Sequence, residues 1–169
     1  MDILVGPGCR YGIKYCNMEN NEFKADPIIE LDPSYQDTVV EILRNSKLPH
    51  SDIDLAKQFF IGQGTSAKLV GIGALEFYGQ NALVRSMAVL NNGQNRGVGS
   101  SLLGYLLKTA KNKKVESLYL LTETAERFFA RNGFEKVDRV VVPGDILESE
   151  EFKNLCPGDA ICMVYRLES

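Results

Sequence analysis

Residues 81–102 have the pattern of a strand, a loop and a helix in direct succession, and this stretch constrains the fold most. The run from Ala82 to Leu90 has the length and the apolar content of a β-strand. An Asn-Asn-Gly turn ends it, and from Gly97 onward the leucines recur with helical spacing. A helix start behind a loop with Gly97 and Gly99 offers unpaired backbone N–H groups to a bulky anion. The stretch therefore predicts a phosphate-binding loop.

Two common phosphate loops do not fit this stretch. A P-loop requires Lys-Ser or Lys-Thr after its last glycine, but Gly99 is followed by Ser100 and Ser101. A dinucleotide loop requires a third small residue where Leu102 stands, so it fits only in part. A dinucleotide-binding domain remains a rival interpretation, and a glycine-rich turn that only caps a helix is the other.

Bulk properties indicate one globular domain and exclude several partners. The chain has 169 residues and a formal net charge of −3. Without a large basic patch, nucleic acid is not expected. The four cysteines include no Cys-x-x-Cys pair, and there is one histidine, so no metal site is expected. The apolar runs are too short for a membrane span, and we expect a cytoplasmic protein with free thiols.

The order of predicted elements indicates an α/β fold with a mixed sheet. We expect strands at 27–31, 59–61, 68–78, 82–90, 115–121, 134–137 and 160–167. We expect helices at 33–48, after an Asp32 cap, and at 51–57. Further helices are expected from residue 97 onward and from a Thr122 or Thr124 cap to Arg131. Gly79-Gln80 is predicted to be a two-residue hairpin turn. Residues 1–24 lack periodicity and are expected to be a loosely ordered extension, so the domain spans 25–169.

The loop Gln94-x-x-Gly97-x-Gly99, after a strand ending Met87-Ala-Val89, resembles the acetyl-CoA pyrophosphate loop of the GNAT superfamily of N-acetyltransferases. The resemblance covers residues 26–138 and implies the GNAT-like acyl-CoA N-acyltransferase fold, with helices on both faces of the sheet. Longer runs, such as the one that starts at Glu151, look like the group called arsenic-resistance N-acetyltransferases.

The resemblance implies an acetyl-CoA site along the strand and the loop. The residues expected to bind the cofactor are Met87, Val89, Gln94, Asn95, Arg96, Gly97, Val98, Gly99 and Ser100. In the superfamily the pantetheine arm lies against the main chain of this strand, whose N–H groups also hold the oxyanion. The side chains of Met87 and Val89 are expected to be ordinary core residues in any fold.

Glu76 and Arg85 are predicted to be diagonal neighbours on one face of the hairpin, because a two-residue turn pairs Glu76 with Leu83. An amine acceptor must lose a proton, so Glu76 is a candidate base and Arg85 a candidate anchor for a substrate carboxylate. A solvated ion pair is the equal alternative.

The superfamily often uses a tyrosine to protonate the departing CoA thiolate, and the matching position here is Phe129. A phenyl ring cannot donate a proton. Either the thiolate leaves with the help of water, or Tyr119, Thr122 or Thr124 supplies the acid. Packing is the favoured interpretation of Tyr119.

The sequence thus predicts an acetyl-CoA-dependent N-acetyltransferase that acts on a small amine, with an amino acid or an amino-acid-like toxicant as the candidate acceptor. The rival is a non-catalytic module that binds acetyl-CoA or an arsenical. A trivalent arsenical would have to bridge the thiolates of Cys156 and Cys162. Inert core thiols are the favoured interpretation of these cysteines. A homodimer is left open.

Overall fold

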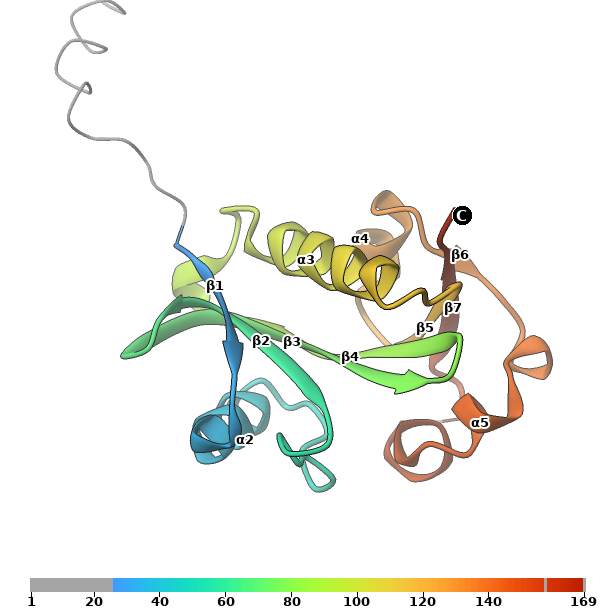
Figure 1. Ribbon diagram of the computed structural model, residues 1–169, viewed down its shortest axis with the longest axis horizontal. Helices are drawn as coiled ribbons and strands as arrows, with labels where there is room; N and C mark the ends of the chain where they lie inside the picture. Colours follow the sequence, from blue (N-terminus) through green and yellow to red (C-terminus); the bar gives the residue numbers. More distant parts are fainter. Residues whose placement is uncertain (1–25, 157, 169) are drawn as a thin grey trace, which may run out of the picture.

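A seven-stranded mixed sheet runs through the middle of the molecule, with strand order β1-β2-β3-β4-β5-β7-β6 (Figure 1). This computed structural model describes residues 26–156 and 158–168. The predicted extension at 1–24, together with Cys9 and Cys16, lies outside the described residues. Neighbouring strands are antiparallel except for β4 and β5, which run parallel.

The seven strands occur in the order that the sequence predicts. The strands are β1 (Ile28–Leu31), β2 (Phe59–Thr65), β3 (Lys68–Tyr78), β4 (Asn81–Val89), β5 (Ser117–Thr122), β6 (Glu135–Lys136) and β7 (Ile161–Arg166). The helices are α2 (Gln36–Asn45), α3 (Val98–Asn112), α4 (Glu126–Arg131) and α5 (Gly144–Leu147). Shorter turns are η1 (Pro33–Tyr35), η2 (Asn91–Gly93), η3 (Arg139–Val141) and the π-helical turn η4 (Glu151–Leu155).

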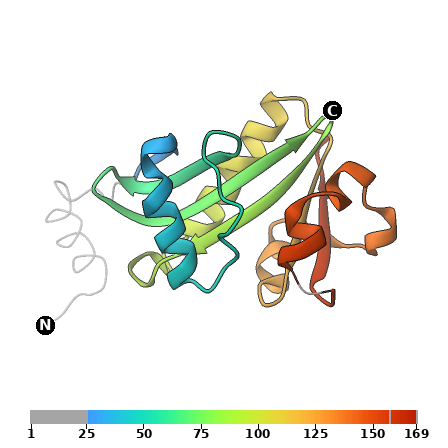
Figure 2. The same cartoon turned by 90° about the horizontal axis from the view of Figure 1, so that it is seen from below.

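Helices cover both faces of the sheet, with α3 and α4 on one face and α2 and α5 on the other (Figures 1 and 2). The leucines of α3 pack on the sheet beside Phe129 of α4 and form the largest buried cluster. Opposite them, α2 packs over β2, β3 and β4. The segment with α5 and η4 packs over Leu83, Tyr119 and the inner residues of β7. Alternate residues of β4 and β5 therefore face different cores, as a strand requires.

The hairpin between β3 and β4 has the predicted form. Tyr78 pairs with Asn81, and Glu76 pairs with Leu83. Gly79 adopts a φ of +58°, which a glycine accepts without strain. The strands before and after the loop helix, β4 and β5, pair directly in the sheet. Among the described residues, no helix has both the length and the apolar character needed to cross a bilayer.

Two local predictions were wrong. Residues 51–57 form irregular turns instead of a helix, because side chains take over the backbone hydrogen bonds: Gln36 Oε1 accepts from Leu55 N at 3.1 Å and Asp54 Oδ1 from Ala56 N at 3.0 Å. The strand predicted at 59–61 does not turn at Gly62 but continues to Thr65. Gly62 is of a residue type that favours turns, yet it lies within a strand. The side chain of Leu69 packs so close to it that a Cβ would not fit without a shift.

Candidate active site

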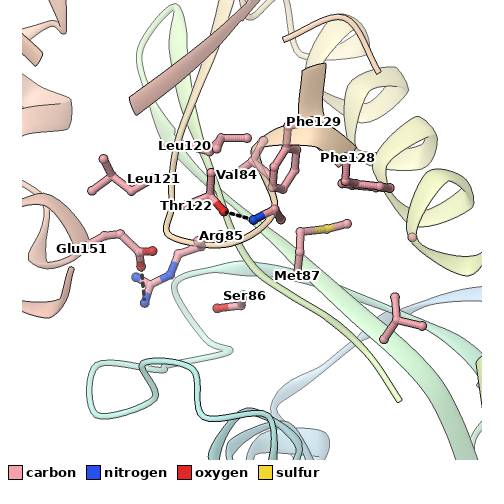
Figure 3. A pocket seen from close by; sticks show the side chains of 13 residues that line it. Val84, Arg85, Ser86, Met87, Leu120, Leu121, Thr122, Phe128, Phe129 and Glu151 are labelled. Atoms are coloured by element: carbon pink, nitrogen blue, oxygen red, sulfur yellow. Dashed lines mark hydrogen bonds and ion pairs between the residues drawn. The ribbon is translucent and has the colours of Figure 1, made fainter. Parts of the chain in front are cut away.

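The parallel strands β4 and β5 separate soon after they meet. Among the described residues they pair only at Asn81–Ser117, Ala82–Leu118 and Leu83–Tyr119. Beyond this point, within the described part of the chain, each strand presents an edge without a strand partner to the gap. A cavity of about 240 Å³ occupies the gap (Figure 3). Its lining residues are Val84, Arg85, Ser86, Met87, Val89, Gly99, Leu120, Leu121, Thr122, Ala125, Phe128, Phe129 and Glu151.

A β-bulge shapes the β4 side of the cavity. Ile72 pairs with Ala88 and Ala74 with Arg85, so Ser86 and Met87 together oppose Gly73. Ser86 has a φ of +56°, an uncommon conformation for a residue with a side chain. Its Oγ is buried and has no hydrogen-bond partner among the described residues. The bulge interrupts the ladder with β3 at the point where β4 also lacks a partner on β5.

The start of α3 closes one end of the cavity. Gly97 caps the helix with a φ of +76°, and the first helical hydrogen bond runs from Ser101 N to Gly97 O at 2.9 Å. The N–H groups of Val98, Gly99 and Ser100 therefore have no acceptor within the helix. Gly99 lies against the aromatic wall of the cavity, since a methyl group on it would come 3.2 Å from the Phe128 ring. The predicted phosphate loop thus adjoins the cavity.

The predicted cofactor residues divide into two groups. Met87, Val89 and Gly99 line the cavity. The remaining six, Gln94, Asn95, Arg96, Gly97, Val98 and Ser100, form the turn and the first residues of α3. Among them, the side chain of Val98 is buried in the core, and the exposed Arg96 donates to Asn92 O at 2.9 Å. Their roles in binding remain predictions that rest on the main chain of this turn.

The end of the cavity under α3 and α4 is apolar and aromatic. Phe128 and Phe129 meet edge to face with 5.0 Å between their ring centroids (Figure 3). Thr122 Oγ1 accepts a hydrogen bond from Ala125 N at 3.0 Å, so the hydroxyl supports the turn into α4. Phe129 lies where the resemblance leads one to expect a tyrosine.

The other end of the cavity holds Arg85, on the face of the sheet that carries α2 and α5. Its guanidinium contacts three carboxylates from three different segments. Nη1 lies 2.6 Å from Asp52 Oδ2 and 2.6 Å from Glu76 Oε2. Nη2 lies 2.7 Å from Asp52 Oδ1 and 3.1 Å from Glu151 Oε2. The Arg85 side chain is 1% exposed, so this is a buried cluster and not a solvated ion pair.

Burial and charge shift the pKa values within this cluster. Burial raises the pKa of Glu151, the neighbouring Arg85 lowers it in part, and Asp52 and Glu76 raise it further. Burial alone would lower the pKa of Arg85, but the hydrogen bonds and charges of its carboxylate partners more than offset that effect, so its pKa is raised. Arg85 is therefore a permanent cation here.

The structure brings together the predicted pair Glu76 and Arg85 but leaves both catalytic candidates away from the cavity. Glu76 accepts from Tyr78 Oη at 2.6 Å and from Gln58 Nε2 at 3.0 Å as well as from Arg85. Tyr119 is 8% exposed and packs in the core under α5. Neither residue lines the cavity in the described part of the chain. Packing is the interpretation that the position of Tyr119 favours.

The geometry also argues against Arg85 as an anchor for a substrate carboxylate. Both terminal nitrogens already have carboxylate partners. A fourth carboxylate beside them would meet more negative than positive charge. The anchor role stays a prediction, and a buried structural cation is the simpler account of this side chain.

Sequence reasoning missed Asp52 and Glu151. Asp52 lies in the irregular loop before β2, and Glu151 lies in the π-helical turn before β7. Glu151 follows two exposed glutamates, Glu148 and Glu150, so no local pattern distinguishes it. The π-helical turn that carries Glu151 is a rare structure that often occurs at functional sites, but the sequence of the turn does not reveal it.

Cys156 and Cys162 are free thiols. Cys162 is buried beside Tyr119 and Ile146, and half-buried Cys156 lies 3.5 Å from Glu151 Oε1. Burial is the main cause that raises the pKa of both thiols. Both are therefore protonated at neutral pH, which suits inert thiols.

A mixed sheet that splits between two parallel strands, with a helix that starts at the split, defines the acyl-CoA N-acyltransferase fold. Residues 56–136 match the family described as Acetyltransferase (GNAT) domain. Over these residues the chain thus matches a GNAT acetyltransferase domain.

Solved structures share this fold. The N-acetylglutamate synthase from Neisseria gonorrhoeae, in complex with coenzyme A and L-arginine, superposes with a TM-score of 0.71 and 18% identity, over 86% of this chain and 34% of that one. An acetyltransferase of the GNAT family from Staphylococcus aureus Mu50 gives a TM-score of 0.67 and 20% identity, over 85% of this chain and 100% of its own.

A curated relative is similar in sequence. The amino-acid acetyltransferase of Mycobacterium tuberculosis (strain ATCC 25618 / H37Rv) is 29% identical over 82 residues. The match covers 48% of this chain and 47% of the relative, so it spans about half the length of each.

Proposed function

We propose that this chain is an acetyl-CoA-dependent N-acetyltransferase that acetylates the amine of a small molecule. The observation that carries the proposal is the cavity in the gap between β4 and β5, because it adjoins both the free N–H groups at the start of α3 and the bulged edge of β4. A long thin donor with a phosphate group at one end and a thioester at the other fits this arrangement.

The proposed binding mode follows the geometry. The pyrophosphate contacts the N–H groups of Val98, Gly99 and Ser100, where the helix dipole favours negative charge. The pantetheine arm lies along β4 past Val89 and Met87, whose main chain offers hydrogen bonds on the side away from β3. The thioester then reaches the bulge at Ser86, and the amine enters from the end that holds Glu151.

In the proposed reaction the amine nitrogen attacks the thioester carbonyl carbon. The carbon–sulfur bond breaks, and CoA leaves as a thiolate, a tolerable leaving group because its thiol has a pKa of about 8.5. Backbone N–H groups at the bulge of β4 are placed to stabilise the oxyanion. A group at the acceptor end must take a proton from the amine, which arrives mostly as an ammonium ion.

The proposed acceptor is an amino acid or an amino-acid-like molecule. Support comes from the curated relative, whose name is amino-acid acetyltransferase. An amino-acid-like toxicant, as the resemblance to the arsenic-resistance group implies, belongs to the same class. If the acceptor has a carboxylate, we expect it to lie away from the acidic cluster around Arg85.

A thiol-release assay tests the proposal. Purified protein is mixed with acetyl-CoA and a panel of the twenty common amino acids, their amides and simple primary amines, and free CoA is measured. Release with at least one amine, together with the acetylated product by mass spectrometry, supports the enzyme. Thermal stabilisation by acetyl-CoA without release from any amine supports a non-catalytic binding module, and stabilisation by NAD but not by CoA supports a dinucleotide-binding domain.

A further inference from the structure

We infer that Glu151 is the base that takes the proton from the acceptor amine, an inference that rests on the proposed function. Glu151 lines the cavity at the end opposite α3, and its side chain is 9% exposed (Figure 3). It comes from η4, in the segment between α5 and β7, and not from the β3–β4 hairpin, where the sequence offers Glu76 as a candidate base.

The hydrogen bonds of the cluster distinguish Glu151 from the other two carboxylates. Both carboxylate oxygens of Asp52 accept hydrogen bonds from Arg85, Oδ2 at 2.6 Å and Oδ1 at 2.7 Å. Glu76 is bound by Arg85, Tyr78 and Gln58, with both oxygens occupied at 3.0 Å or less. Glu151 has a longer contact to Arg85 at 3.1 Å, and within residues 26–156 and 158–168 its other oxygen meets only the weak donor Cys156 Sγ at 3.5 Å. Glu151 is thus the carboxylate with unused acceptor capacity.

The charge of the cluster also favours a proton on Glu151. Three carboxylates surround one guanidinium, so the ionised cluster has negative charge in excess. Asp52 approaches from the loop before β2, Glu76 from β3, and Cys156 from the same segment as Glu151. One added proton reduces the repulsion, and the most buried carboxylate gains most from it because burial disfavours its charged form. Arg85 opposes this effect, because its charge lowers the pKa of Glu151 and favours the ionised form that can accept a proton.

The proton transfers balance in a simple sequence. The ammonium gives one proton to Glu151, and the neutral nitrogen then attacks the thioester carbon. The carbon–sulfur bond breaks, and the nitrogen loses a second proton as the amide forms. One of the two protons ends on the CoA sulfur and the other passes to solvent, which returns Glu151 to its ionised state.

The test compares Glu151→Gln with the control Glu150→Gln, which changes an exposed glutamate next to it. The probes are ethylamine, which is protonated at neutral pH, and trifluoroethylamine, which is of similar size and mostly unprotonated. Glu151→Gln should lower kcat/KM for ethylamine by about two orders of magnitude or more and for trifluoroethylamine by less than about threefold. The control should change neither value, and acetyl-CoA affinity by calorimetry should be unchanged in both variants.

Equal losses with both amines would assign Glu151 a positioning role, and no loss with ethylamine would remove it from the reaction; either result overturns the inference. If the wild type accepts neither probe, NMR titration of the labelled carboxyl carbons decides, with the Glu151 signal assigned by its loss in Glu151→Gln. A raised pKa supports the base, and an ordinary or lowered pKa rejects it. Absence of transfer to every amine of the wider panel would instead reject the proposed function itself.

Discussion

Leu83 and Tyr119 form the last bridge between β4 and β5, and the two strands separate directly after them. The side chains of both residues pack in the core under α5, which holds the strands together at this point. The next residues of each strand, Val84 and Leu120, line the cavity. The gap is therefore a fixed property of the sheet, and a ligand that enters it finds backbone edges on both sides.

The first prediction concerns the cavity itself. Ala125 lines it at the start of α4, whereas Ala130 on the same helix is exposed. Ala125→Trp should lower acetyl-CoA affinity at least about tenfold, because the indole fills space that the pantetheine arm needs. Ala130→Trp should leave the affinity unchanged. Calorimetric titration with CoA measures both, and equal affinities in the two variants would place the donor elsewhere.

The second prediction concerns the start of α3. Gly97→Glu should abolish detectable CoA binding, because it adds negative charge beside the free N–H groups. A Cβ at Gly97 meets no atom within 4 Å, so the fold should survive with a backbone strain of about 1–2 kcal/mol at its positive φ.

The matched control for Gly97→Glu is Gly104→Glu, an exposed position further along α3 with equally open space. The control should keep CoA affinity and slightly stabilise the helix. Arg96→Ala should weaken binding less than Gly97→Glu, since an exposed cation contributes modestly. If Gly104→Glu also loses CoA binding, the loss reflects added negative charge in general, and the assignment of a phosphate-binding loop at Gly97 is wrong.

The relation between Glu76 and Arg85 was predictable from the sequence because it depends on local geometry. The turn at Gly79 fixes the register, and register decides which side chains share a face. The strand, loop and helix around Gly97 were predictable for the same reason, since strand length, glycines and leucine spacing all lie within about twenty residues.

The partners that complete the cluster were not predictable. Asp52 is 33 residues before Arg85, in a loop whose side-chain hydrogen bonds replaced a predicted helix. Glu151 reaches Arg85 only because α5 and η4 fold back over the sheet. Such contacts depend on tertiary packing, which no short pattern encodes. The sequence thus placed the donor end of the site better than the acceptor end.

The third prediction concerns the stability of the acidic cluster. Arg85→Leu should lower the free energy of unfolding by about 3–5 kcal/mol, because it leaves three partly buried carboxylates without a cation. Loss of Arg85 also removes the charge that lowers the pKa of Glu151 in part, so this pKa should rise further above its unfolded value. Folded protein would bind more protons than unfolded protein in that range, so the stability of the variant should recover as the pH falls toward about 4.

Urea unfolding at several pH values measures this effect, with Arg96→Leu as the control for loss of an exposed arginine. If Arg85 instead anchors a substrate carboxylate, Arg85→Leu should keep its stability and raise KM for anionic amines alone. That result would restore the interpretation drawn from the sequence.

The fourth prediction concerns the pH dependence that Glu151 gives to wild-type stability. Its folded pKa is raised, so the folded state binds more protons than the unfolded state from about pH 4.3 up to the folded pKa. Stability should therefore fall as the pH rises through this window and level off above it. Glu151→Gln should flatten this part of the profile, and Glu150→Gln should not. If the stability of the wild type instead rises with pH in this window, and rises less in Glu151→Gln, the folded pKa of Glu151 is lowered and not raised.

The last prediction concerns the departure of CoA. Phe129 lines the cavity and packs edge to face on Phe128 and Phe134, while Tyr119 lies in the core under α5. If the thiolate leaves without a protein acid, Tyr119→Phe and Phe129→Tyr should each change turnover by less than about threefold, since a thiol with a pKa of about 8.5 gives a tolerable leaving group. Turnover is measured in the wild type, both single variants and the double variant, with acetyl-CoA affinity checked in each. A fall in the turnover of Tyr119→Phe by about two orders of magnitude, with turnover partly restored when Phe129→Tyr is added, would instead identify a tyrosine hydroxyl as the acid. Tyr119 would then have to reach the cavity by a movement of β5.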